Sequence, residues 1–215
     1  MNILITGARG FVGKNLVAAL KNIRDGKDRT HPELSIGEIY EYGSADGYEQ
    51  LADYCKRSDF VFHLAGANRP PKQEDFMEVN CGLTEVLLNT LEREGNACPV
   101  MLSSSVQATL EGRFAGSEYG RSKLAGENAA FTYAERTGAR VLVYRFPNIF
   151  GKWCRPNYNS AVATFCYNIA NDLPITVNDR STQLELLYID DLVDELLLAL
   201  DGREHREDKF CKAPV

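Results

Sequence analysis

The chain has 215 residues, 44% of them hydrophobic and 25% charged, which is typical of a single globular domain with a sizeable core. A net charge of -6 argues against nucleic acid or an anionic membrane surface as the main partner. With no long apolar run, no leader sequence and six scattered cysteines, we expect a reduced, cytoplasmic protein that does not bind membranes.

Apolar strands are predicted to alternate with helices along the first two thirds of the chain. The expected strands are Asn2–Thr6, Glu38–Tyr42, Phe60–His63, Val100–Ser103 and Val141–Arg145. The expected helices lie near Phe11–Asn22, Tyr48–Lys56, Asp75–Glu94 and Tyr119–Arg136. This alternation is typical of an α/β protein with a doubly wound parallel sheet and helices on both faces.

The pattern changes after Gly151. A loop rich in Pro and Asn is followed by expected elements near Ala161–Asn171 (helix), Pro174–Val177 (strand), Leu184–Tyr188 (strand) and Asp190–Leu200 (helix). Residues from Lys209 onward look like the beginning of another strand. We expect this part to be a small, truncated lobe, anchored by the single tryptophan, Trp153.

Three glycines spaced by three follow the first strand: Gly7, Gly10 and Gly13. Glycine lets the backbone turn sharply, approach a phosphate and pack the next helix on the sheet. The first N–H groups of that helix, near Phe11 and Val12, would then face an anion. The spacing differs from the usual Gly-x-Gly-x-x-Gly, but its strand-to-helix context predicts a dinucleotide site, with a plain glycine-rich turn as the alternative.

A second candidate site lies after the fourth strand. Tyr119 and Lys123 are four residues apart, so they share one helix face, and Ser103, Ser104 and Ser105 end the preceding strand. Ligands of open parallel sheets bind at the carboxyl ends of the strands, where the glycine loop also lies. We predict that Tyr119 is the general acid of a carbonyl reduction, that Lys123 lowers its pKa and holds the nicotinamide ribose, and that Ser105 hydrogen-bonds the carbonyl oxygen. A surface Tyr–Lys pair is the alternative.

Six motifs resemble, in order, those of the extended short-chain dehydrogenase/reductase family. They are Thr6–Gly13, Asp59–Gly66, Asn80, Ser103–Ser105, Tyr119-x-x-x-Lys123 and Arg145–Gly151. The resemblance covers nearly the whole chain and implies a Rossmann-like fold, a nicotinamide dinucleotide and, often, a nucleotide-sugar substrate. It also implies a homodimer formed through the helices near residues 75–94 and 119–136.

The same resemblance implies roles for single residues. The family pattern places the catalytic serine third of three, at Ser105. Leu64, Ala65 and Gly66 would form a wall against the adenosine half of the cofactor, with Pro147 as a further contact. Asn80 would steady the sheet near the active site through hydrogen bonds.

Residues 65–70, 150–160, 163–167 and 177–180 resemble the reductase part of CapF-type capsular polysaccharide enzymes. This resemblance implies the NADPH-dependent reduction of a UDP-linked 4-keto-6-deoxy-N-acetylhexose on the route to UDP-N-acetyl-L-fucosamine. Those enzymes also carry a C-terminal cupin domain, and nothing here resembles it. We therefore expect residues 1–150 to form an NAD(P)-binding Rossmann domain, and residues 151–215 to form a partial substrate-binding lobe with elements that complete the sheet.

The choice between NADP and NAD depends on two residues. An acidic residue at the end of the second strand favours NAD, whereas a nearby Arg accommodates a 2′-phosphate. Glu41 lies near the first position and Arg9 lies inside the glycine loop. Either could be a plain solvated side chain. We weigh the cation above the acid and predict NADP, with NAD as the less favoured cofactor.

Polar residues after the fifth strand are candidates for holding the sugar or its diphosphate, together with Ser105. They are Asn148, Arg155, Asn157, Asn159 and Arg180. The alternative for the loop asparagines is ordinary turn formation. We expect no metal, because the three histidines are far apart and no Cys/His ligand spacing occurs.

Two other functions remain open. One is an NAD-dependent nucleotide-sugar epimerase or dehydratase, although the positions beside Ser105 hold Ser104, Val106 and Gln107, where a dehydratase commonly has acids. The other is a non-catalytic dinucleotide-binding module, which would have no use for the serine, tyrosine and lysine. Net consumption of the cofactor would separate reduction from both.

Overall fold

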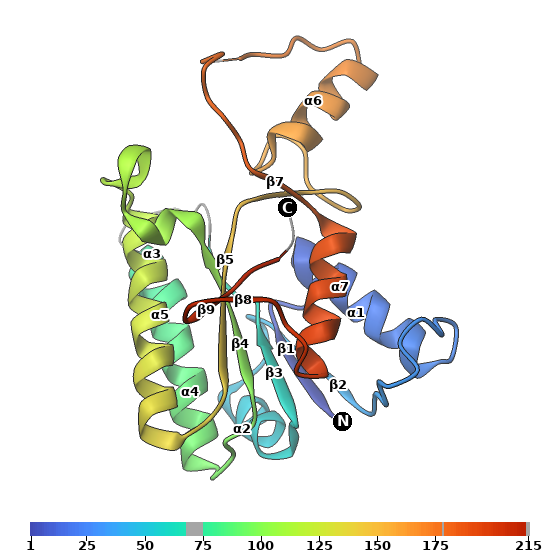
Figure 1. Ribbon diagram of the computed structural model, residues 1–215, viewed down its shortest axis with the longest axis vertical. Helices are drawn as coiled ribbons and strands as arrows, with labels where there is room; N and C mark the ends of the chain where they lie inside the picture. Colours follow the sequence, from blue (N-terminus) through green and yellow to red (C-terminus); the bar gives the residue numbers. More distant parts are fainter. Residues whose placement is uncertain (68–74, 178, 214–215) are drawn as a thin grey trace.

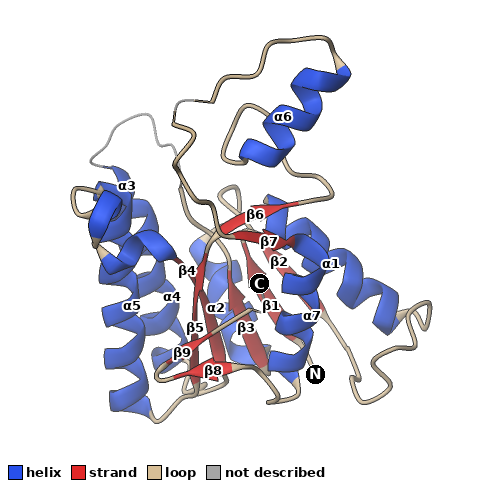
Figure 2. Cartoon of the chain, turned by 45° about the horizontal axis from the view of Figure 1, so that its top comes forward, coloured by secondary structure: helices blue, strands red, loops and turns tan. Residues whose placement is uncertain are grey.

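The computed structural model describes residues 1–67, 75–177 and 179–213. Within these residues, seven strands form one sheet in the order β2-β1-β3-β4-β5-β9-β8, and β6 pairs with β7 in a separate sheet (Figures 1 and 2). Neighbouring strands are parallel except for the antiparallel pair β8–β9. The arrangement is the expected doubly wound, Rossmann-like fold. Parts of three predicted segments lie outside the described residues: Asn68–Pro70, Asn178 and Pro214–Val215.

The predicted strands of the main sheet are confirmed to within two residues. They are β1 (Ile3–Thr6), β2 (Ile39–Tyr42), β3 (Phe60–His63), β4 (Val100–Ser105) and β5 (Val141–Phe146). The strand β4 continues through Ser105, because all three serines pair with residues 144–146 of β5. The carboxyl ends of β1, β3, β4 and β5 therefore lie at one edge of the sheet.

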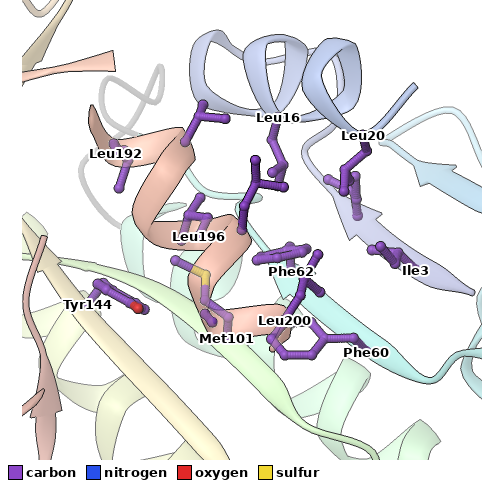
Figure 3. Close-up of a cluster of buried hydrophobic side chains, with 14 of the residues drawn as sticks. Ile3, Leu16, Leu20, Phe60, Phe62, Met101, Tyr144, Leu192, Leu196 and Leu200 are labelled. Carbon is purple, nitrogen blue, oxygen red and sulfur yellow. The ribbon is translucent and has the colours of Figure 1, made fainter. Parts of the chain in front are cut away.

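Helices cover both faces of the sheet (Figure 1). The helices α1 (Phe11–Arg24) and α7 (Ile189–Leu200) pack on one face, where Ile3 and Ile5 join Leu16, Leu196 and their neighbours in one apolar cluster (Figure 3). The other face, which Leu4 enters, is covered by α2 (Tyr48–Arg57), α4 (Leu83–Arg93) and α5 (Glu118–Thr137). Successive residues of a strand point to opposite faces, so alternate residues of β1 contribute to the two clusters.

The helix predicted over Asp75–Glu94 is interrupted. It consists of α3 (Asp75–Met77), a π-helical turn (Glu78–Gly82) and α4. A π turn adds one residue to the helical turn, and such turns occur frequently at functional sites. Asn80 lies in this turn, and its buried side chain points away from solvent.

The segment after Gly151 leaves the body of the protein. The helix α6 (Ala161–Ala170) has no buried residue and projects beyond the carboxyl edge of the sheet (Figure 1, orange). The strand predicted at Pro174–Val177 is wrong. This stretch is attached to the end of α6 instead, because Asn168 accepts a hydrogen bond from Leu173 N at 2.8 Å and donates one to Pro174 O at 2.9 Å.

The last part of the chain returns to the sheet. Its strands are β7 (Leu186–Tyr188), β8 (Arg206–Glu207) and β9 (Phe210–Cys211). Earlier in the chain, the sequence did not reveal the short strand β6 (Asn148–Phe150) or the 3₁₀ turns Val106–Thr109 and Gly112–Phe114. The strand β9 confirms the expectation of a strand near Lys209, and it pairs with β5 at Tyr144 and Cys211. In the described part of the chain, no helix is long and apolar enough to cross a membrane.

The buried helix α7 and the exposed segment after α6 should differ in how much a truncated side chain lowers the free energy of unfolding. Leu196 is fully buried between α7 and the sheet, so Leu196→Ala should lower the free energy of unfolding by about 2–5 kcal/mol. Ile175 is 46% exposed, so Ile175→Ala should change it by about 0.5 kcal/mol or less. Urea titration of both variants measures the difference, and equal losses would show that residues 174–177 are packed like a core strand.

Candidate active site

The glycine loop forms a cradle that has no room for side chains. Gly7 has φ +72°, and a Cβ there would lie 2.7 Å from the backbone nitrogen of Ala65. A Cβ on Gly13 would lie 2.3 Å from Gly7 O. In the part of the chain that the structure describes, no side chain caps α1, and no acid lies in its first turn, so its first N–H groups face the loop without competition. These features fit a dinucleotide pyrophosphate.

A cavity of about 1000 Å³ opens above this loop, at the carboxyl ends of the strands. This volume is at the upper end for small-molecule sites and suits a ligand as large as a dinucleotide with a second molecule beside it. Most of the predicted site residues line it: Gly7, Arg9, Gly10, Phe11, Val12, Gly13, Leu64, Gly66, Ser105, Tyr119, Lys123, Pro147, Asn148, Arg155 and Asn159.

Five predicted residues do not line the cavity. Asn80 and Ala65 lie just behind its wall, where Ala65 N donates to Thr6 Oγ1 at 3.3 Å. Glu41 forms an ion pair with Lys21 at 2.6 Å, which ties it to α1. Asn157 is an exposed turn residue with φ +54°, and Arg180 lies in the exposed segment after α6, so the structure does not bring these two to the other site residues.

Asn80 holds the wall of the cavity in place. Its Oδ1 accepts from Ala67 N at 2.9 Å, and its Nδ2 donates to Ala67 O at 3.1 Å and to Ser122 Oγ at 3.0 Å. Gly66 is held between these groups, since a Cβ there would lie 2.8 Å from Asn80 Oδ1 and 3.1 Å from Lys123 Nζ. The loop after β3 is therefore fixed against α5.

Ser105, Tyr119 and Lys123 converge at the cavity wall. Ser105 ends β4, caps the following turn by accepting from Gln107 N at 3.2 Å, and hydrogen-bonds the Tyr119 side chain. Tyr119 lies in the first turn of α5, and Lys123 follows one turn later. The Lys123 ammonium is buried, donates to Ser103 O at 2.9 Å and lies 5.8 Å from the centre of the Tyr119 ring.

Burial dominates the ionisation of this group. It raises the pKa of Tyr119 to about 12, against the hydrogen bond from Ser105, which lowers it. Burial also lowers the pKa of Lys123 to about 8, while the carboxylate of Glu127 raises it. The predicted effect of Lys123 on the pKa of Tyr119 stays a prediction, because the rise to about 12 follows from lost solvation at the phenol, with the hydrogen bond from Ser105 acting against it.

Two charged side chains, Arg9 and Asp46, lie near the end of β2, and the sequence predicted only Arg9 as a site residue. A Cβ on Gly43 would lie 3.9 Å from Arg9 Nη1 and 3.8 Å from Asp46 Oδ2, so both side chains reach the same spot. Asp46 Oδ2 accepts from Gly43 N at 2.8 Å. The Asp-Gly pair at 46–47 is a turn signal, and it was the one clue in the sequence to this acid.

Sequence reasoning also missed two polar or aromatic groups of the cavity. Gln107 lines it next to Ser105, and its Oε1 accepts from Ser117, the residue that caps α5, at 2.8 Å. Trp153 does not anchor the lobe. It is 50% exposed and lines the cavity, and the Lys152 ammonium lies 4.1 Å from the centre of its ring.

The comparisons with known proteins agree with this geometry. Residues 3–209 match the NAD dependent epimerase/dehydratase family. The chain is 42% identical over 203 residues to a UDP-2-acetamido-2,6-beta-L-arabino-hexul-4-ose reductase of Pseudomonas aeruginosa, covering 94% of this chain and 50% of that protein. It is 29% identical over 242 residues to UDP-glucuronate 4-epimerase 4 of Arabidopsis thaliana, covering 95% of this chain and 55% of that protein.

Among solved structures, the capsular polysaccharide assembling protein CapF of Staphylococcus aureus superposes with a TM-score of 0.81 at 42% identity, over 100% of this chain and 54% of that one. The chain thus spans about half the length of the relatives it matches. The chain belongs to the NAD dependent epimerase/dehydratase family, the extended short-chain dehydrogenases and reductases that its motifs indicate.

Proposed function

We propose that this protein is an NADPH-dependent reductase of a UDP-linked 4-keto-6-deoxy-N-acetylhexose, acting in the synthesis of a capsular polysaccharide precursor of the UDP-N-acetyl-L-fucosamine type. The observation that carries the proposal is the convergence of Ser105, Tyr119 and Lys123 on the cavity that the glycine loop lines. The 42% identity to a reductase of a UDP-linked hexul-4-ose supports the substrate class.

The side chains divide the chemistry between them. A bound nicotinamide dinucleotide would supply the hydride for the carbonyl carbon of the sugar. Tyr119 remains protonated at neutral pH because burial raises its pKa to about 12, so its hydroxyl can donate the proton to the carbonyl oxygen. Ser105 would donate a hydrogen bond to that oxygen as negative charge develops on it. Lys123, on the same helix face, adds a positive charge beside both groups.

The sugar side of the cavity is polar and aromatic. Asn148 and Asn159 line it, and Arg155, whose guanidinium lies 5.5 Å from the centre of the Tyr158 ring, lines it as well. We propose that Arg155 holds the diphosphate, since its planar fork matches phosphate oxygens, and that the two asparagines bind the sugar. Trp153 offers an exposed ring face for the sugar or the uracil.

The preference for NADPH rests on Arg9. Its guanidinium reaches the end of β2, where the adenosine ribose lies in Rossmann folds. Glu41, the acid that favoured NAD in the sequence, is paired with Lys21 instead. Asp46 lies at the same strand end and is the group that would favour NAD.

An epimerase is the second candidate, because 95% of this chain matches UDP-glucuronate 4-epimerase 4 of Arabidopsis thaliana at 29% identity. The two activities differ in stoichiometry. A reductase oxidises one NADPH for each sugar reduced, whereas an epimerase regenerates its cofactor. Following the loss of NADPH absorbance with a UDP-linked 4-keto-6-deoxy-N-acetylhexose decides between them, and NADPH binding without turnover of any sugar would favour a non-catalytic module.

Tyr119→Phe removes the proposed proton donor and should lower kcat by about 10²–10⁴-fold. NADPH affinity should be unchanged, because the ring stays in place. Tyr133→Phe is the matched control: Tyr133 lies on the same helix, donates to Asn96 O at 3.3 Å and does not line the cavity. Stopped-flow absorbance and calorimetry measure the two quantities, and full activity of Tyr119→Phe would contradict the assignment.

Arg9→Ala tests the cofactor. We expect NADPH to bind about 10- to 100-fold more weakly and NADH to bind nearly as before, because only the 2′-phosphate loses a charge-assisted hydrogen bond. Arg24→Ala, at the far end of α1, is the control. Equal losses for both nucleotides in a calorimetric titration would exclude Arg9 as the 2′-phosphate contact.

The rate of reduction should depend on the charge of Lys123. With a pKa of about 8 in the free protein, Lys123 is protonated near neutral pH, so kcat/KM should be constant there and decline as the pH rises through about 8. Initial rates at subsaturating NADPH across the alkaline range give kcat/KM for the free protein and so measure the profile. A plateau that continues to the normal pKa of lysine would show that this charge is not needed.

A further inference from the structure

Five buried polar side chains link the glycine loop to the helix that carries Tyr119. Each belongs to a different element, none of them lines the cavity, and each is at most 3% exposed: Thr6, His63, Asn80, Thr84 and Ser122. Thr6 and His63 lie inside two of the motifs, but neither they nor Thr84 have been assigned a role in the proposed chemistry. Buried polar groups of this kind are retained where every partner is satisfied, and here the bonds run without a gap.

The first half of the chain of hydrogen bonds centres on His63, the last residue of β3. Its Nδ1 lies 2.7 Å from the hydroxyl of Thr6, and its Nε2 lies 2.9 Å from the hydroxyl of Thr84. Thr6 directly precedes Gly7, and its Oγ1 also accepts from Ala65 N at 3.3 Å. These hydrogen bonds of Thr6 therefore hold the contact between Gly7 and Ala65 that shapes the cradle.

The second half leads to α5. The Thr84 hydroxyl donates to Asn80 O at 2.7 Å, and Asn80 Nδ2 donates to Ser122 Oγ at 3.0 Å. Ser122 Oγ donates in turn to the backbone oxygen of Tyr119 at 2.8 Å. This end fixes the first turn of α5, from which the Tyr119 ring reaches the cavity.

The number of protons on each group fixes which atom donates in each of these hydrogen bonds. A threonine hydroxyl has one proton, and that of Thr84 is used on Asn80 O, so Thr84 Oγ1 can only accept from His63. The proton of the ring is therefore on Nε2, and Nδ1 accepts from the Thr6 hydroxyl. A ring with a single proton agrees with its burial and with the nearby Lys123, which together lower the pKa of His63 to about 3.

We propose that His63, with its ring proton on Nε2, is a positioning residue that sets the distance between the glycine loop and Tyr119. The inference rests on the proposed reduction, because it assigns the residue a role in placing the proton donor against the cofactor loop. His63 touches neither ligand. It acts through Thr84 and Asn80 on one side and through Thr6 on the other.

Two threonines of α4 provide a matched test. Thr84 and Thr90 are both buried, and each donates to the carbonyl four residues earlier at 2.7 Å, but only Thr84 meets His63. Thr84→Val and Thr90→Val should lose similar stability. Only Thr84→Val should lower kcat, by about tenfold or more, since small displacements of a reacting group cost this much. Its dissociation constant for NADPH should stay within about threefold, because the contact between His63 Nδ1 and Thr6 Oγ1 is kept whichever of the two atoms carries the proton.

Thr84→Ser keeps the hydroxyl and should restore kcat to within about threefold of the wild type. Nitrogen NMR of the labelled 215-residue chain reads the ring directly. We expect Nε2–H in the wild type and in Thr90→Val, and a shift toward Nδ1–H in Thr84→Val, where Nε2 has lost its acceptor. A merely structural role would lower the stability of both variants without lowering kcat in Thr84→Val alone.

The outcomes separate the two ideas. Nδ1–H in the wild type, or equal kcat for Thr84→Val and Thr90→Val, would overturn the role of His63 while leaving the reductase intact. A wild-type chain that binds NADPH but reduces no 4-keto sugar would overturn the proposed function, and the NMR measurement would still decide whether the hydrogen-bond chain has the proposed direction.

Discussion

The close approach of three backbones at the glycine loop is the constraint on which the rest of the structure depends. Gly7 packs on Ala65 and Gly13 packs on Gly7, with no space for a single added carbon at either contact. The loop cannot retreat, because Gly7 N donates to Tyr42 O at 3.0 Å. Since β1, β2, β3 and α1 are all tied to this point, the N-terminus of α1 opens onto the same sheet edge as the serines of β4.

The electrostatics of the site follow from a second constraint, the burial of Lys123. A nearby negative charge favours the ammonium of this buried lysine, and Glu127 supplies that charge one turn along α5. The Glu127 carboxylate also forms an ion pair with Arg145 at 2.6 Å. Loss of solvation is the larger effect on the pKa of Lys123, and the carbonyl oxygen of Ser103 accepts a hydrogen bond from the ammonium.

Local signals in the sequence were sufficient for the first five strands of the sheet, for three of the four helices predicted before residue 150 and for most of the cavity. Strand-end position predicted Ser105 and Asn148 well, because parallel strands bring their carboxyl ends together whatever the loops do. Loop residues were harder: Asn157 and Arg180 belong to segments whose path depends on tertiary contacts. The strand expected at Pro174–Val177 failed because periodicity cannot tell a paired strand from an extended stretch attached to a helix. His63 read as part of an apolar strand, and no local pattern shows that its two neighbours are threonines from distant elements.

The place of α7 has a consequence for how the chain is made. It covers the same sheet face as α1, yet about 165 residues separate the two helices in the sequence. Ribosomes add about 5–20 residues each second. The apolar surface of β1 and β3 on that side therefore stays uncovered by α7 for on the order of ten seconds or more. During synthesis this surface is a natural binding site for chaperones, and the nascent protein cannot close its core until residue 200 has left the exit tunnel.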